Sequence, residues 1–295
     1  MSDFSATSRV LDMKNVIRRS RGQVIGAVLV MGLGAVPCVA HAQQPVMAAP
    51  FAAPRGGVPE LVTDRPDFTE SSEIIERGSL QFESGVNYES DAESGLLSRA
   101  FSAPTALLRI GLGHRAELRV GADGLVTTSV AGSRVSGYSD VELGAKIRLF
   151  DQRSLGVDLA VLPMVSLPTG SDDFSSGAAD PTVKITWARD LPAGFGLSGN
   201  VNASSISEDG RRFHQQALSA SLGHDLVAGF GSYVEVYGFS KMSPDDGRGV
   251  TVDGGVSHLI GGDIQFDIET GRGLTAAAPD WFIGVGIAIR GRVRR

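Results

Sequence analysis

Charged side chains recur at every second position in several segments of this 295-residue sequence. In residues 140–149, Asp140, Glu142, Lys146 and Arg148 alternate with apolar residues, so one face is charged and the other is apolar. A face with both signs of charge could orient a solute or set the ion selectivity of a water-filled passage. The same charges could instead neutralise one another in a lumen that is polar by default. The inward candidates on this criterion are Glu83, Arg109, Glu117, Arg119, Asp140, Glu142, Lys146, Arg148, Glu235, Asp267 and Glu269.

Sequence patterns that would indicate catalysis or metal binding are weaker than the alternation of charged residues. His214 and Ser219 lie on one predicted strand, but their spacing places them on opposite faces, so they do not form a base and nucleophile pair. The Gly-rich stretch at 111–116 precedes a strand pattern instead of the helix that a dinucleotide site requires. The acidic pairs at 172–173 and 245–246 lack the ligand spacing of a dedicated Ca²⁺ site. We therefore predict no enzyme activity and no cofactor; a barrel phospholipase is the enzymatic alternative.

The elements that must carry the charged faces are β-strands, because apolar and polar residues alternate with a period of two. In residues 116–123 and 264–269 the two faces differ as clearly as in 140–149. The pattern predicts twelve strands near 79–90, 100–112, 115–128, 136–150, 154–167, 180–190, 194–206, 213–225, 230–241, 249–259, 262–271 and 280–290. Many exceed the usual globular length of about 5–6 residues and match the ~9–11 that cross a bilayer.

The connections between the predicted strands alternate between short and long. Five are short, and six longer polar ones lie at 91–99, 129–135, 168–179, 207–212, 242–248 and 272–279. Outer-membrane barrels place short turns on the periplasmic side and long loops outside, and an even strand count returns both ends to the periplasm. We therefore predict an all-β fold, a transmembrane antiparallel up-and-down β-barrel of about twelve strands over residues 79–295.

The N-terminus has the features of an export signal. Four basic residues between Lys14 and Arg21 precede an apolar run at 24–36, and Ala42 ends a small-x-small cleavage pattern. We predict a signal peptide at 1–42, cleaved after Ala42, with initiation at Met1 or Met13. Cleavage would remove five basic and two acidic residues and move the net charge from −6 to about −9. Such an acidic chain argues against a nucleic-acid partner.

Residues 43–78 form a predicted flexible leader before the first strand. The part around Asp64, Arg65 and Asp67 is too charged to sit in lipid. One hypothesis places it inside the barrel as a partial plug whose charges meet those of the lumen. The alternative is a tether in the periplasm.

Several motifs of the mature chain resemble a known bacterial outer-membrane family, labelled "putative MetA-pathway of phenol degradation". They are Thr63-Asp64-Arg65-Pro66-Asp67-Phe68-Thr69-Glu70-Ser71, Gln81-Phe82-Glu83-Ser84-Gly85, the stretch from Asp140 to Lys146, the stretch from Leu167 to Asp173, and Ala277-Ala278-Pro279-Asp280-Trp281-Phe282. The resemblance implies a barrel with a role in the uptake of small compounds, including aromatic ones. The basic ending from Arg290 to Arg295 departs from the aromatic residue that usually closes the last strand.

The sequence thus predicts an outer-membrane channel for passive uptake of small solutes. Its expected partners are outer-membrane lipid, a small-molecule solute and the machinery that inserts barrels. The alternative is a structural or adhesive barrel with a closed lumen, because the interior of a narrow barrel can be filled by side chains.

Overall fold

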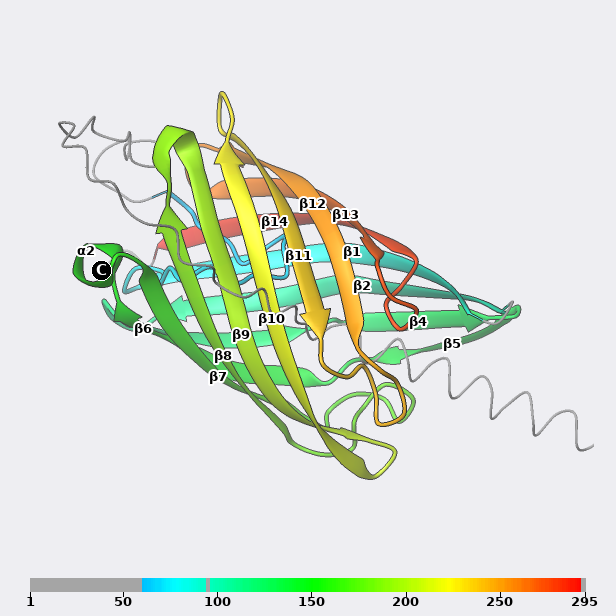
Figure 1. The fold of residues 1–295 in the computed structure, drawn as a ribbon. Helices are drawn as coiled ribbons and strands as arrows, with labels where there is room; N and C mark the ends of the chain where they lie inside the picture. Colours follow the sequence, from blue (N-terminus) through cyan, green and yellow to red (C-terminus); the bar gives the residue numbers. More distant parts are fainter. Residues whose placement is uncertain (1–59, 94–95, 293–295) are drawn as a thin grey trace, which may run out of the picture.

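The computed structural model describes residues 60–93 and 96–292. The predicted signal peptide at 1–42 and the first part of the leader, 43–59, lie outside the described residues. Within them, β-strands follow one another from residue 79 to residue 292 with very little helix (Figure 1).

The strands form one antiparallel sheet, which closes on itself because β1 pairs with both β2 and β14. The strands are β1 (Ser79–Glu93), β2 (Leu96–Gly111), β3 (Ala116–Ala122), β4 (Leu125–Val130), β5 (Ser133–Tyr138), β6 (Val141–Phe150), β7 (Asp158–Leu167), β8 (Asp180–Asp190), β9 (Phe195–Glu208), β10 (Arg211–Asp225), β11 (Phe230–Phe239), β12 (Gly249–Ile260), β13 (Ile264–Gly273) and β14 (Trp281–Arg292).

Two of the twelve predicted strands are interrupted. β3 and β4 both pair with β2 and are separated at Asp123-Gly124, where Gly124 has a φ of 64°. β5 and β6 pair with β4 and β3 and are separated at Ser139-Asp140. Each pair therefore forms one broken strand, and the predicted barrel of twelve strands is confirmed.

The connections differ in part from those predicted. Long loops at 129–135 and 207–212 are wrong, because the strands continue to two-residue turns at Ala131-Gly132 and Asp209-Gly210. All four turn residues have positive φ, the conformation that suits a tight hairpin between twisted strands. The strand predicted from 154 begins at Asp158 instead.

A short helix, α2 (Gln152–Leu155), takes the place of the first residues of that predicted strand. Asp151 caps it by accepting a hydrogen bond from the Ser154 backbone N–H. Hydrogen bonding to Ser154, first through its side chain and then through its backbone, lowers the pKa of the Asp151 carboxyl. The connection between β8 and β9 contains a 3-10 helix, η2 (Pro192–Gly194). No helix in the described part of the chain is long and apolar enough to cross a membrane.

The two ends of the barrel are distinct. We call the end with α2 and η2 the short-turn end, and the opposite end, with the 168–179 and 240–248 connections, the long-loop end. Ser79 pairs with Arg292, so the first strand starts and the last strand ends together at the short-turn end (Figure 1).

The outer and inner faces are the reverse of those of a soluble protein. Side chains such as Phe82, Ile185, Phe266 and Val285 are exposed on the outside. The largest fully buried side chains are mostly polar and face the lumen, among them Arg109, Lys146, Gln81, Glu83, Glu117 and Glu235. This is the arrangement of a barrel surrounded by lipid with a polar interior.

Candidate functional site

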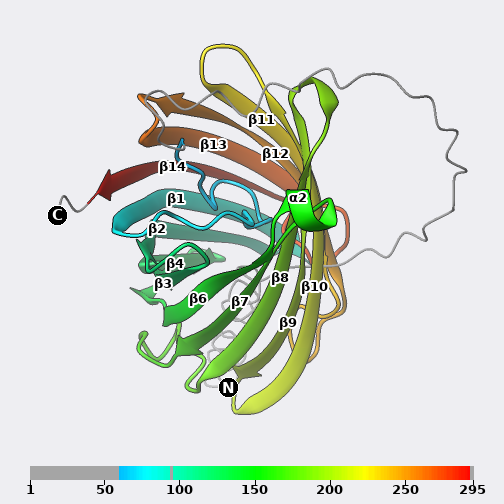
Figure 2. The same ribbon diagram turned by 90° about the vertical axis from the view of Figure 1, so that its left-hand side faces the viewer.

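Residues 60–78 run inside the ring of strands (Figure 2, blue trace), and we call them the lumen segment. Its contacts with the barrel wall centre on Asp64. Lys146 Nζ lies 2.8 Å from Asp64 Oδ1, and Arg119 Nη1 lies 2.5 Å from Asp64 Oδ2. Arg109 Nη1 is 3.2 Å from the same Oδ2. One carboxylate of the segment is thus bound by three cations from β2, β3 and β6.

These cations belong to a larger group, the cationic wall, which consists of Arg109, Arg119, Lys146 and Lys184 on strands β2, β3, β6 and β8. Arg109 binds Glu117 through two hydrogen bonds, from Nε at 2.8 Å and from Nη2 at 3.0 Å. Arg119 and Lys184 both bind Glu70 of the lumen segment. Every member of the cationic wall therefore has a carboxylate partner, and the lumen segment supplies two of these carboxylates.

The electrostatic balance at Asp64 follows from this geometry. Burial alone would raise the pKa of the Asp64 carboxyl, but Arg109, Lys146 and Arg119 together hold it well below its usual range. Asp64 is therefore ionised at neutral pH and fixes the segment to the cationic wall.

The other side of the lumen carries the acidic wall, Glu235, Asp253, Asp267 and Glu269, on β11, β12 and β13. Glu235 accepts hydrogen bonds from the backbone N–H groups of Phe68, at 2.7 Å, and Thr69, at 2.9 Å. Arg65 Nη2 lies 3.3 Å from Asp267 Oδ1. On this side the segment thus offers neutral donors and a single guanidinium group.

Asp67 lies between the two walls in a different environment from Asp64. Burial, followed by the nearby carboxylate of Glu235, raises the pKa of the Asp67 carboxyl well above its usual value. The two aspartates are three residues apart, yet neighbouring cations favour the ionised form of Asp64, whereas burial and a neighbouring carboxylate favour the protonated form of Asp67.

The Arg65 side chain is accommodated by two glycines in adjacent strands. A Cβ on Gly286 in β14 would lie 2.3 Å from Arg65 Nε, and one on Gly85 in β1 would lie 2.6 Å from Arg65 Cζ. The guanidinium group can reach Asp267 because neither strand has a side chain at these positions.

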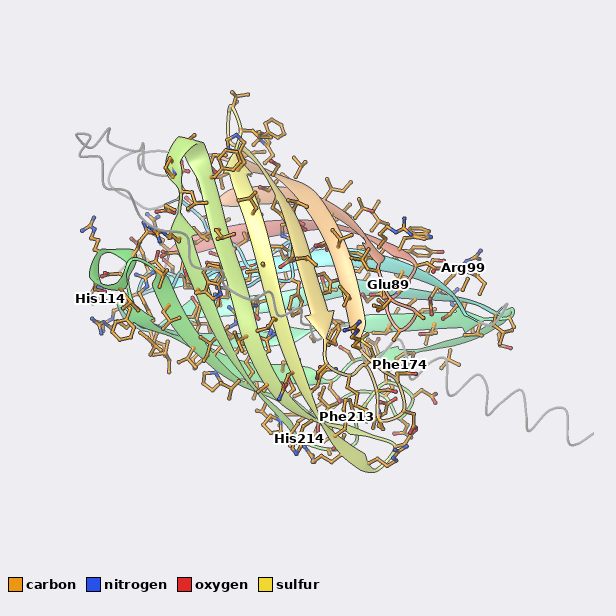
Figure 3. The ribbon with its side chains drawn as sticks, in the orientation of Figure 1. Glu89, Arg99, His114, Phe174, Phe213 and His214 are labelled. Atoms are coloured by element: carbon orange, nitrogen blue, oxygen red, sulfur yellow. The ribbon has the colours of Figure 1, made fainter. Side chains whose placement is uncertain are left out.

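A cavity of about 390 Å³ opens above the lumen segment toward the long-loop end. Figure 3 places Phe174 and Phe213 at this end, whereas His114 lies at the opposite end. The cavity is bounded by Asp64, Asp67 and Phe68 of the segment and by Glu142, Lys184 and other wall residues. A small solute that entered from the long-loop end would therefore meet charged and apolar side chains together.

The remaining predicted residues have distinct positions. Asp140 lies at the break between β5 and β6 and accepts hydrogen bonds from the backbone N–H groups of Gly170 and Ser176, so it orders the long loop. Glu142 faces the cavity, and Arg148 pairs with Glu73 of the lumen segment. Their role in a solute path remains a prediction.

Sequence reasoning missed Glu70, Lys184, Tyr233 and Asp253. Lys184 and Asp253 stand on polar faces, with Thr182 and Thr186 beside Lys184 and Thr251 beside Asp253. Those faces could have been recognised from the same period of two. Tyr233 gave no signal, because an aromatic residue suits either face of a strand.

The described residues contain no cluster of three or more histidine, cysteine or acidic side chains arranged to hold a metal ion. His114 and His214 lie at opposite ends of the barrel (Figure 3). His224 and His258 stack on Phe195 and Phe230, with ring centroids 4.2 Å and 4.0 Å apart. These contacts account for both rings as packing groups.

Among solved structures, one that aligns with a TM-score above 0.5 supports the barrel fold, and two others that align at lower scores are given for comparison. An outer membrane channel from Pseudomonas putida F1 aligns with a TM-score of 0.56 and 14% identity over 77% of this chain and 100% of that chain. The NanC porin aligns at 0.45 with 10% identity, covering 71% and 98% of the two chains. The transport unit of the autotransporter AIDA-I from Escherichia coli aligns at 0.46 with 8% identity, covering 77% and 94%.

No curated protein matched the sequence. A family model described as "Putative MetA-pathway of phenol degradation" matches residues 63–291, which include the lumen segment from Thr63 onward and nearly all of the barrel. The chain belongs to this family of proteins.

Proposed function

We propose that the protein is an outer-membrane channel through which small solutes diffuse without a cofactor. The observation that carries the proposal is the polar lumen with its cavity of about 390 Å³, enclosed by a barrel whose outer face is apolar. Lipid would contact the outer face, and insertion would depend on the cell's barrel-insertion machinery despite the basic C-terminus.

The solute class is proposed from the cavity lining. Phe174, Phe213 and Met164 contribute apolar surface beside Glu142 and Lys184. A binding site with apolar walls and a few fixed polar groups suits a small ring compound with one polar substituent. The family's description agrees with an aromatic solute.

The lumen segment acts in this proposal as a partial plug. Its ion pairs reach both walls, through Asp64 and Glu70 on one side and Arg65 on the other. A solute would pass beside the segment, or the segment would shift to widen the passage.

A second candidate is a structural barrel with a closed lumen. It is favoured by the burial of four charged side chains in the lumen near Asp64, since Arg109, Glu83, Glu117 and Lys146 are each at most 1% exposed. The two candidates differ in whether ions cross the refolded protein.

Conductance in planar bilayers tests the proposal. We expect discrete single-channel steps from the refolded protein and larger steps after deletion of residues 60–72. D245N, in an exposed loop outside the lumen, is the matched control and should conduct like the wild type. Silence of both the wild type and the deletion variant would support the structural barrel instead.

Liposome swelling then tests the solute class. Benzylammonium, benzyl alcohol and benzoate share one ring and differ in charge. Faster swelling with these compounds than with sugars of similar size would support an aromatic solute, and equal rates would oppose it.

A further inference from the structure

The members of the acidic wall are buried but unequally partnered. Glu235, Asp253, Asp267 and Glu269 are 1%, 5%, 6% and 8% exposed. Glu235 is satisfied by Phe68 and Thr69, and Asp267 pairs with Arg65. Among residues 60–93 and 96–292, no cationic side chain lies within ion-pair distance of Asp253 or Glu269. These two carboxylates are therefore the part of the wall without an ion-pair partner.

Asp253 and Glu269 also have too few hydrogen-bond donors around them. The Tyr233 hydroxyl lies 3.4 Å from Asp253 Oδ2 and 3.5 Å from Glu269 Oε2. A phenol has one proton and can donate to only one of them at a time. Asp253 Oδ1 is buried without any hydrogen-bond partner, and so is Asn87 Oδ1 in β1. Burying a hydrogen-bond acceptor without a donor costs free energy, so a ligand that brings hydrogen-bond donors or positive charge would stabilise this site.

Gly284 in β14 allows two of these acceptors to approach each other. A Cβ on Gly284 would lie 2.4 Å from Glu269 Oε1 and 2.7 Å from Asn87 Oδ1. The two oxygens thus converge at a position where the strand has no side chain, and the Tyr233 hydroxyl lies within 3.5 Å of both Glu269 and Asp253.

The cavity at the long-loop end, like the acidic wall, carries more negative than positive groups. Nine of its lining residues carry a carboxyl group, of which Asp67 favours the protonated form, and three are cations. Two of the carboxylates, Asp123 and Glu142, form no ion pair or side-chain hydrogen bond with the rest of the described chain. A solute approaching from this end therefore meets a negative entrance before it reaches the acidic wall, which attracts cations and repels anions.

We propose that the lumen passes cations in preference to anions, and that Asp253 and Glu269, with Tyr233 and Asn87, hold the passing cation. An ammonium group would supply the missing donors, and an alkali ion would supply the missing charge. This inference rests on the proposed channel function and adds that the preferred solutes carry a single positive charge.

Reversal potentials in a tenfold KCl gradient test the inference. We expect the wild-type channel to reverse toward the potassium equilibrium potential. In D253N/E269Q, which keeps the shape of both side chains, the ratio of potassium to chloride permeability should fall by about threefold or more, because two charges leave a narrow lumen. D172N/D173N, which removes the same charge from exposed positions in the 168–179 loop, should reverse like the wild type.

A second gradient distinguishes an ammonium group from an alkali ion as the preferred cation. With KCl on one side and benzylammonium chloride on the other, the reversal potential reports whether the site prefers the organic ammonium or the alkali ion. A wild-type channel that conducts but favours chloride, or an equal shift in both double variants, would overturn the inference.

A crystallographic measurement tests the cation site independently of the proposed channel function. In crystals soaked in thallium(I), a potassium substitute, an anomalous peak should lie in contact with Asp253 and Glu269 and be absent from D253N/E269Q crystals. A peak in a protein that is silent in bilayers would support the cation site while removing the channel function. Absence of the peak in wild-type crystals would count against the site. Heat-modified gel mobility would show that the variants fold.

Discussion

The cationic wall and the acidic wall line opposite sides of one lumen but are compensated in different ways. Arg109, Arg119, Lys146 and Lys184 all bind carboxylates, and the lumen segment provides Asp64 and Glu70 among them. On the acidic wall the segment provides one cation, Arg65. The first wall is thus complete within the chain, whereas the second retains negative charge. The difference supports our proposal that one wall anchors the segment and that the other is available to a solute.

The largest effect is expected from removing the centre of the cationic wall. Arg109→Met leaves the buried carboxylates of Glu83 and Glu117 without their shared cation, which should cost about 3–5 kcal/mol of unfolding free energy. Urea unfolding in detergent micelles would measure the loss. The matched control is Arg115→Met, at an exposed position in a short turn, which should change stability by less than about 0.5 kcal/mol. Equal effects of the two substitutions would contradict the anchoring role of this wall.

The two aspartates of the lumen segment should respond differently to neutral replacement. Asp64→Asn removes the charge that binds Lys146 and Arg119 and should cost about 2 kcal/mol. Asp67→Asn should cost less than about 0.5 kcal/mol, because its raised pKa already favours the neutral form. Unfolding free energies measured at neutral pH would compare them. A larger cost for Asp67→Asn would reverse our assignment of the two environments.

The link between the segment and the acidic wall can be weakened without changing charge. Gly286→Ala brings a methyl group into contact with Arg65 and should displace its guanidinium group from Asp267, at a cost of about 1 kcal/mol. Gly291→Ala is the control, since no atom lies within 4 Å of its added Cβ. If Gly286→Ala had no effect on stability or conductance, the Arg65 contact would be dispensable.

The smallest effect is expected from mild acid. A depressed pKa means that the contribution of Asp64 is present above the ordinary carboxyl value of about 3.9 and is lost only as the pH falls through its lower folded value. The raised pKa of Asp67 acts in the opposite sense, since its contribution is lost as the pH rises through the folded value. Protease sensitivity of the segment should therefore not increase between pH 7 and about 4.5. Release in that range would show that other groups control the docking.

The barrel could largely be predicted from the sequence. Apolar and polar residues alternate because one face of each strand lies against lipid and the other faces the lumen. The interruptions at Asp123-Gly124 and Ser139-Asp140 were not, since alternation continues on both sides of each break. The hairpin extensions around Ala131-Gly132 and Asp209-Gly210 also escaped prediction. Strands that project beyond a bilayer have water on both faces, so their sequence no longer alternates.

The candidate site was predictable only as a set of inward faces. Alternation shows that Arg119 and Lys146 share the lumen face, but the stagger of the strands sets the height at which each side chain stands. The meeting of Asp64 with both residues depends on that stagger and on the path of the lumen segment. For the same reason the sequence alone could not show that Glu70 pairs with Lys184, although both residues are charged.

The contacts of the lumen segment also bear on how the chain is assembled. Arg65 and Asp267 are 202 positions apart, and Arg290 Nη1 donates to the Glu60 carbonyl across 230 positions. Such distant partners can meet only after the last strands have formed, because the entropy of closing so long a loop opposes earlier contact. The residues that leave the export machinery before any strand are thus among the last to reach their final place. Docking of the segment and pairing of β1 with β14 bring together the same two ends of the chain, so each closure favours the other.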